Sequence, residues 1–303
     1  MMDAFRANAR AIPPTYLEED AVCPRNPIVQ ALKPVLESSR EILPGAVYEP
    51  LYEVLFASYK SALRAFYLRN VLNRWLARDQ EGLFRAKSVR RVMPYSLVGA
   101  SGLEATFDAA SDLVQNGIVG AFVECGVARG GCAALMATVA AQESPARQMW
   151  LFDSFDGLPS PTSEDYGEDN GATGRHIRPL VRGSCCGRKD EVEALLFSRF
   201  GFARDSISLV QGWFQDTLPL HKKQIGPIAL LRIDGDWYES TMCCLENLYE
   251  NVSPRGAIII DDYGVCFGCK RAVHEFFAKR DIHPRLIPDN RGGVRFSKDA
   301  PHR

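Results

Sequence analysis

The chain has 303 residues, of which 46% are hydrophobic and 24% are charged, and its formal net charge is -1. That length is enough to bury a large core, and the near-zero charge argues against a nucleic-acid or anionic-membrane partner. No apolar run reaches the roughly 18 residues that span a bilayer, and the opening MMDAFRANARAIPP lacks the apolar core of a signal peptide. We therefore expect a cytoplasmic protein with neither a nucleic acid nor a membrane as partner.

The first 90 residues carry many prolines, followed by a helical spacing of apolar residues over 51–76. This pattern predicts a mainly helical N-terminal extension, 1–90, in front of a larger domain, 91–303. Nothing in the extension indicates chemistry.

From residue 120 onward, short apolar runs alternate with helical patterns. We predict strands at 120–126, 148–153, 206–212, 228–234 and 257–262, helices at 128–142, 190–201, 238–252 and 269–281, and a final extended pair at 283–288 and 292–297. The alternation predicts an α/β fold: a doubly wound, Rossmann-like parallel sheet with helices on both faces. Residues 159–189 lack periodicity and are too long for an ordinary connection, so we predict a lid-like loop there.

Nine cysteines are scattered through the predicted helices and strands, which indicates reduced thiols rather than a disulfide framework. The pair Cys266 and Cys269 forms a CFGC motif that could indicate zinc or redox chemistry. Zinc, however, requires further Cys or His ligands at a compatible spacing. We therefore favour packing roles for these thiols.

In a doubly wound sheet, ligands bind outside the carboxyl ends of the strands. The first strand ends in VECGVARGG, where Glu124 precedes a turn containing Gly126. Glycines there allow a ligand to approach the backbone closely. The sequence fits GxGxxG poorly, and an acid in the turn suits a ligand with a cationic amino group, such as the methionine part of S-adenosylmethionine. A tight turn with no ligand is the alternative.

Two further strand ends suggest cofactor contacts. Asp153 lies where doubly wound folds place the acid that binds a ribose diol, although this position does not separate a nicotinamide dinucleotide from S-adenosylmethionine. Trp213 or Phe214 could cover an adenine ring, but a core position is at least as probable for either aromatic taken alone.

The next two strands end in IDGD and IIIDD, which place four acids, Asp234, Asp236, Asp261 and Asp262, at the ends of very apolar segments. Carboxylates packed together destabilise one another unless a cation or a proton lies between them. If the two strands are neighbours, three of the acids converge on a site suited to Mg²⁺ or another hard divalent cation. The alternative is that they cap the helices that follow.

These motifs, VECGVARGG, LFDSFDGLP, GWFQDTLP, LRIDGDWYEST and IIIDDYG, with MPYSLVG upstream, resemble the macrocin O-methyltransferase (TylF/MycF-like) family over about residues 90–297. The resemblance implies a class I methyltransferase fold, S-adenosylmethionine as methyl donor, dependence on Mg²⁺ and a homo-oligomer. It also implies a small-molecule acceptor, a hydroxyl of a sugar or of a glycosylated natural product. The cysteine-rich GSCCGRKD and the C-terminal GGVRFSKDAPHR depart from the family pattern.

Carried over by position, the resemblance assigns roles to particular residues. Asp234, Asp261 and Asp262 would hold the metal, and Asp236 would be the general base. The residues expected to bind the cofactor are Glu124, Gly126, Asp153, Ser154 and Trp213, with Tyr95 and Ser96 closing over its methionine end.

The chemistry follows from charge. A divalent cation bound to an alcohol oxygen favours the alkoxide, and Asp236 then accepts the proton. A vicinal diol could bind through both oxygens, and Gly235 would let the chain turn so that Asp236 faces the acceptor. Two other functions remain open: a nicotinamide-dependent oxidoreductase, and a non-catalytic binding module with a vestigial site.

Overall fold

The computed structural model describes residues 45–167 and 176–299. The proline-rich start of the extension and the centre of the predicted lid-like loop therefore lie outside the described residues.

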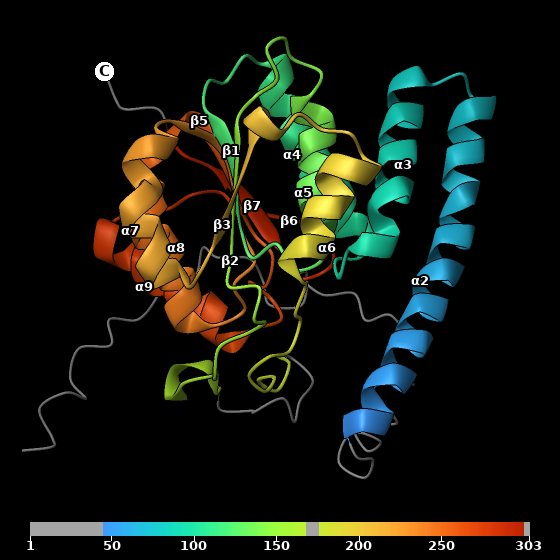
Figure 1. The fold of residues 1–303 in the computed structure, drawn as a ribbon. Coiled ribbons are helices and arrows are strands. Elements are labelled where there is room, and N and C mark those ends of the chain that lie inside the picture. Colours follow the sequence, from blue (N-terminus) through green and yellow to red (C-terminus); the bar gives the residue numbers. More distant parts are fainter. Residues whose placement is uncertain (1–44, 168–175, 300–303) are drawn as a thin grey trace, which may run out of the picture.

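A seven-stranded sheet forms the middle layer, with strand order β3-β2-β1-β4-β5-β7-β6 (Figure 1). Strands β1 to β5 pair in parallel, while β7 pairs antiparallel with both β5 and β6. The central strands are buried along their whole length, which explains why they are continuous apolar runs. The strand bounds are β1 Ala121–Cys125, β2 Met149–Asp153, β3 Ile207–Gln211, β4 Ile228–Ile233, β5 Val252–Ile260, β6 Ile287–Pro288 and β7 Val294–Ser297.

Helices cover both faces of the sheet, as predicted. One face carries α4 (Ala100–Gln115), α5 (Gly131–Ala140) and α6 (Lys189–Glu193), the last continuing as the π-helix η4 (Ala194–Arg199). The other carries α7 (Phe214–Ile225), α8 (Tyr238–Leu248) and α9 (Phe267–Arg280) (Figure 1). Single 3-10 turns complete the order: η2 Met93–Tyr95, η3 Ser163–Asp165, η5 Arg204–Ser206 and η6 Tyr249–Asn251. Helices α4 and α7 were not predicted from the sequence.

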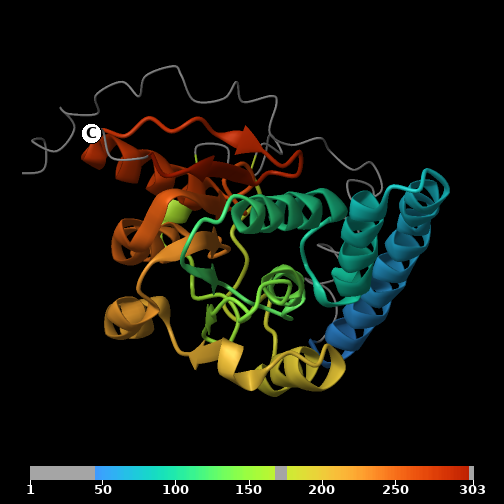
Figure 2. The same ribbon diagram turned by 90° about the horizontal axis from the view of Figure 1, so that it is seen from above.

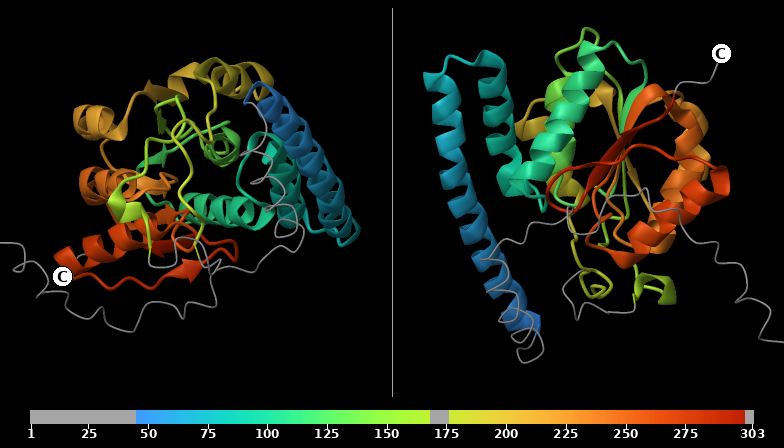
Figure 3. Two further views of the ribbon diagram at one scale, coloured as in Figure 1. Left: turned by 90° about the horizontal axis from the view of Figure 1, so that it is seen from below. Right: turned by 180° about the vertical axis from the view of Figure 1, so that it is seen from behind.

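The described part of the predicted extension, from residue 45, holds α2 (Gly45–Leu76) and most of α3 (Gln80–Val92), two helices that pack on each other outside the α4–α5 layer (Figures 2 and 3). The helical spacing at 51–76 is therefore part of α2. Asp79 caps α3 by accepting a hydrogen bond from the Gly82 amide. Across residues 45–167 and 176–299, no helix combines the length and apolar character needed to cross a bilayer.

Candidate active site

A cavity of about 680 Å³ opens at the carboxyl ends of the parallel strands. This is the edge at which a doubly wound sheet binds its ligands. Every site residue predicted from the sequence lines it: Tyr95, Ser96, Glu124, Gly126, Asp153, Ser154, Trp213, Asp234, Asp236, Asp261 and Asp262. They converge because β1 lies between β2 and β4, and β4 lies beside β5.

Gly126 is required by a neighbouring strand rather than by a ligand. Its φ is 93°, in the region that favours glycine, and a Cβ built on it would lie 1.8 Å from the backbone oxygen of Asp234. No side chain fits between the ends of β1 and β4 at this point. The close approach that the sequence analysis expected of a ligand is thus made by Asp234.

Asp153 organises the glycine turn. Its Oδ2 accepts hydrogen bonds from the amides of Val127 (2.7 Å) and Ala128 (2.9 Å), and its Oδ1 accepts from the amide of Phe155 (2.7 Å). Burial raises the pKa of Asp153, while these amide donors act in the opposite direction. Each carboxylate oxygen can accept two hydrogen bonds, so Oδ1 keeps capacity for a ligand.

The other predicted cofactor residues shape the cavity wall. The hydroxyl of Ser96 accepts from the Val98 amide (3.0 Å), and its Cβ lies so close to Gly131 that a side chain there would overlap it. Ser154 donates to the carbonyl of Gly157 (3.1 Å), and Trp213 is the N-cap residue of α7.

Arg232 compensates part of the negative charge of the clustered acids. Its side chain is fully buried in β4. Its Nη1 donates to Glu124 Oε1 (3.1 Å) and Asp234 Oδ2 (2.8 Å), and its Nη2 donates to Asp261 Oδ1 (2.7 Å). The cation between these carboxylates is therefore supplied by the chain itself. The sequence analysis missed it, although an arginine inside the otherwise apolar IALLRI was a usable signal.

A second arginine, Arg291, adds positive charge beside the acids. Arg291, from the loop between β6 and β7, donates from Nη1 to Asp261 Oδ2 at 2.8 Å. Burial alone would raise the pKa of Asp261, but Arg291 and Arg232 outweigh it and hold that pKa below its usual value. The loop is fixed because Asp289 Oδ1 accepts from the amides of Arg291, Gly292 and Gly293.

Three acids are close enough to share a metal ion. One carboxylate oxygen from each of Asp234, Asp261 and Asp262 lies within 4.8 Å of the others. The arginines do not exhaust these oxygens, because a carboxylate offers about four acceptor positions. An all-oxygen donor set of this kind fits Mg²⁺ or a similar hard cation. The residues present therefore suit the metal that the resemblance implies.

The turn after β4 differs from our expectation. The left-handed residue is Asp236, with φ 55°, and Gly235 has no positive φ. The Trp237 amide donates to the Gly235 carbonyl at 2.5 Å, closing a tight three-residue turn centred on Asp236. At Gly235, a Cβ would lie 3.1 Å from the Cβ of Ser240, a tight contact.

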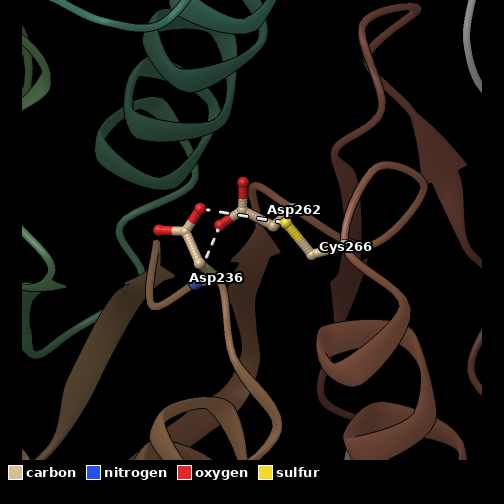
Figure 4. Close-up of side chains that lie close together, drawn as sticks. All are labelled: Asp236, Asp262 and Cys266. Atoms are coloured by element: carbon tan, nitrogen blue, oxygen red, sulfur yellow. Dashed lines mark hydrogen bonds between the residues drawn. The ribbon is translucent and has the colours of Figure 1, made fainter. Parts of the chain in front are cut away.

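Asp236 faces Asp262 and Cys266 (Figure 4). The Asp236 amide donates to Asp262 Oδ2 (3.2 Å), and the Cys266 thiol lies 3.8 Å from Asp236 Oδ1. These three groups are also close enough to share an ion. Enclosure by protein, together with the charges of Asp234 and Asp261, raises the pKa of Asp236 to about 8.

Comparison with known proteins decides the family. Residues 36–298 match the profile of macrocin O-methyltransferase (TylF). The chain belongs to this family. Membership identifies the protein as an O-methyltransferase, with S-adenosylmethionine as the methyl donor that the family implies. The nicotinamide-dependent oxidoreductase and the non-catalytic module are thereby set aside.

Individual relatives agree with the family assignment. The demethyldecarbamoylnovobiocin O-methyltransferase of Streptomyces niveus is 35% identical over 256 residues, 84% of this chain and 89% of that protein. A second relative is the 8-demethyl-8-(2,3-dimethoxy-alpha-L-rhamnosyl)-tetracenomycin-C 4'-O-methyltransferase of Streptomyces olivaceus. It is 36% identical over 201 residues, which cover 66% of this chain and 74% of that protein. The solved structure of the O-methyltransferase NovP superposes with a TM-score of 0.59 at 36% identity, covering 68% of this chain and 83% of NovP. These matches confirm the class I methyltransferase fold.

Proposed function

We propose that this macrocin O-methyltransferase family member methylates a hydroxyl, within a vicinal diol, of a sugar or glycosylated natural product, in a reaction that requires Mg²⁺. The observation that carries the proposal is the arrangement of acids in one cavity. One oxygen from each of Asp234, Asp261 and Asp262 lies within 4.8 Å of the others, and Asp236 lies beside them, joined to Asp262 through its backbone amide. Hydroxyl methylation needs a group that accepts a proton near neutral pH.

The cofactor would lie against β1 and β2, where Glu124, Gly126, Asp153 and Ser154 line the cavity, with Trp213, Tyr95 and Ser96 on its remaining sides. Glu124 supports this placement. Its Oε2 is buried and accepts no hydrogen bond from residues 45–167 or 176–299, although Oε1 is paired with Arg232. A buried acceptor without a donor is costly. The amino group of the methionine part would supply that donor.

Asp234, Asp261 and Asp262 would hold the metal. When bound, a hard divalent cation supplies positive charge that lowers the pKa of a nearby hydroxyl. Asp236 accepts the proton of the attacking hydroxyl, and the Asp262 oxygen that receives its amide hydrogen bond keeps its backbone in place. Arg232 and Arg291 hold Asp261 ionised, so that this carboxylate stays available.

The acceptor class follows from the relatives. The name of one relative specifies a 2,3-dimethoxy-rhamnosyl group and methylation at 4', so we expect a sugar hydroxyl as the acceptor. A sugar presents neighbouring oxygens, and two contacts fix an attacking oxygen better than one. The cavity is also lined by Leu158, Pro159, Ser160, Arg182 and Cys185, and we place the acceptor beside these residues.

The test uses Asp236→Asn with Asp216→Asn, an exposed acid on α7, as control. Transfer of labelled methyl from S-adenosylmethionine is measured with demethyldecarbamoylnovobiocin and with methyl α-L-rhamnopyranoside as acceptors. We expect Asp236→Asn to lose about 10²–10⁴-fold in turnover, the usual contribution of a general base, while the affinity for S-adenosylhomocysteine stays unchanged. Near-normal turnover by Asp236→Asn would remove it from the base role.

A further inference from the structure

Asp236 holds a backbone conformation that must be maintained by its surroundings. A residue other than glycine in the left-handed region is strained and persists only where neighbouring groups fix it. On one side, the Asp236 amide is held by Asp262 at the end of β5. The other side of the turn, Trp237 and Tyr238, is held by a segment far away in sequence.

That segment is 159–165, which contains the turn η3. The carboxylate of Asp165 is buried, and its Oδ1 accepts a hydrogen bond from the Tyr238 amide at 2.7 Å. Its Oδ2 accepts from the Thr162 amide at 2.8 Å, which fixes the carboxylate within its own turn. Beside it, the indole Nε1 of Trp237 donates to the Pro159 carbonyl at 3.2 Å. The two residues after Asp236 are thus both tied to the same segment.

Two helices meet at the Asp165 carboxylate. Tyr238 begins α8, and Gly268 lies in the first turn of α9. A Cβ on Gly268 would lie 2.0 Å from Asp165 Oδ1, so α9 approaches this closely only because residue 268 is a glycine. Helix N-termini favour negative charge. The site is therefore shaped for a carboxylate at position 165.

We propose that Asp165 is a positioning residue for the proton-accepting group. By holding the Tyr238 amide, it keeps the tight turn at Asp236 in its left-handed conformation, and it couples the 159–165 wall of the cavity to that turn. This inference rests on the role proposed above for Asp236. It is distinct from a purely structural role, in which Asp165 would stabilise α8 without affecting catalysis.

The decisive variants are Asp165→Ala and Asp165→Asn, with Glu164→Ala as a matched control. Glu164 is the adjacent residue of the same turn. Its ion pair is with the side chain of Arg271 on α9, which lies over the Tyr238 ring, so Glu164→Ala leaves the hydrogen bond from the Tyr238 amide to Asp165 in place. Asparagine keeps one oxygen that can accept from the Tyr238 amide, so it should restore part of what alanine removes.

We expect Asp165→Ala to lower kcat by about 10²-fold, the scale of a misplacement of roughly 1 Å, with the KM for both substrates changed less than about twofold. Asp165→Asn should recover about tenfold of that loss, and Glu164→Ala should match the wild type.

Trp237→Phe removes the hydrogen bond from the indole to the Pro159 carbonyl. Because this hydrogen bond and that of Asp165 act on one turn, the effects of Trp237→Phe and Asp165→Ala on kcat should be non-additive. Asp165→Asn and Trp237→Phe serve if the alanine variant does not fold.

A readout that needs no acceptor is hydrogen exchange of the Tyr238 amide. It should exchange faster in Asp165→Ala and at the wild-type rate in Glu164→Ala. The proposal is overturned if kcat per folded molecule is unchanged in Asp165→Ala, or if only the acceptor KM rises, which would make Asp165 an acceptor contact. Asp236→Asn, measured in parallel, separates the two claims. Near-normal turnover by Asp236→Asn would contradict the role of Asp236 as the base. If Asp236→Asn is inactive but Asp165→Ala is fully active, only the positioning role of Asp165 is contradicted.

Discussion

At the scale of single residues, Arg232 determines how the acids of the site coexist. It is fully buried and donates to Glu124, Asp234 and Asp261. Removing one partner from a buried ionic cluster leaves the remaining charges uncompensated, which is far more costly than the net value of the pair. The arginine is thus a condition for folding this cavity as well as for its chemistry.

We predict that Arg232→Met lowers the free energy of unfolding at pH 7 by about 3–5 kcal/mol. The control is Arg188→Met, because Arg188 is an exposed arginine paired with the exposed Asp190, and exposed pairs contribute about 0–1 kcal/mol. Urea denaturation of both variants measures the difference. An equal decrease in the free energy of unfolding for both variants would show that the buried Arg232 contributes no more to stability than an exposed arginine.

The loss should also depend on pH. In the wild type the pKa of Asp261 is lowered, so its stabilising contribution is present above its unfolded pKa and is lost only as pH falls through the depressed value. In Arg232→Met only Arg291 remains to oppose the effect of burial, so the pKa of Asp261 should be higher than in the wild type. The stability gap between the two proteins therefore grows as pH rises from the depressed wild-type pKa to the higher pKa of the variant, and it shrinks again when both carboxyls are protonated.

The site residues that end parallel strands could be predicted from the sequence. Acids and glycines that end parallel strands fall at a common edge, so the site residues chosen for that reason all line the cavity. The partners were missed. Arg291 and Asp165 meet Asp261 and Tyr238 only because the chain folds back, and no local pattern marks such contacts.

At the scale of elements, α3 behaves as part of the domain rather than of the extension. It packs on α4 and α5 and buries Leu83, Ala86, Val89 and Val92. The boundary at residue 90 was drawn from proline content and helical spacing, which do not report what a helix packs against. Helix α2 packs on α3 and η2, and its buried Lys60 donates to the Val98 carbonyl at 3.4 Å.

We predict that a chain starting at residue 79 keeps a cooperative thermal transition, whereas one starting at residue 93 does not. The longer form retains α3, and each large apolar side chain that it buries contributes about 1.5–3 kcal/mol. Calorimetry of both chains measures this. A cooperative transition in the shorter chain would place α3 outside the folding unit.

Two helices escaped sequence assignment for local reasons. Helix α4 starts at Gly99 without a side-chain cap, and α7 contains Pro219, which normally marks a break. Their existence is imposed by the sheet, whose faces must be covered. Alternating strand patterns thus fixed the architecture but not every helix.

At the scale of the whole molecule, the sheet places the site and α2 projects from its side (Figure 3). Large apolar side chains on α2 are exposed, including Phe66, Leu72, Trp75 and Leu76. Exposed apolar groups of this size commonly mark interfaces. The homo-oligomer implied by the family resemblance stays a prediction, and α2 is the surface on which it would be sought.

The proposed function requires that methyl transfer depend on a metal ion. The most direct measurement follows labelled methyl from S-adenosylmethionine to demethyldecarbamoylnovobiocin or methyl α-L-rhamnopyranoside before and after EDTA treatment, with metal content determined by mass spectrometry. We predict that metal-free protein binds S-adenosylhomocysteine normally but transfers no methyl, and that added Mg²⁺ restores transfer. Full activity in protein shown to be metal-free would contradict the assignment of Asp234, Asp261 and Asp262.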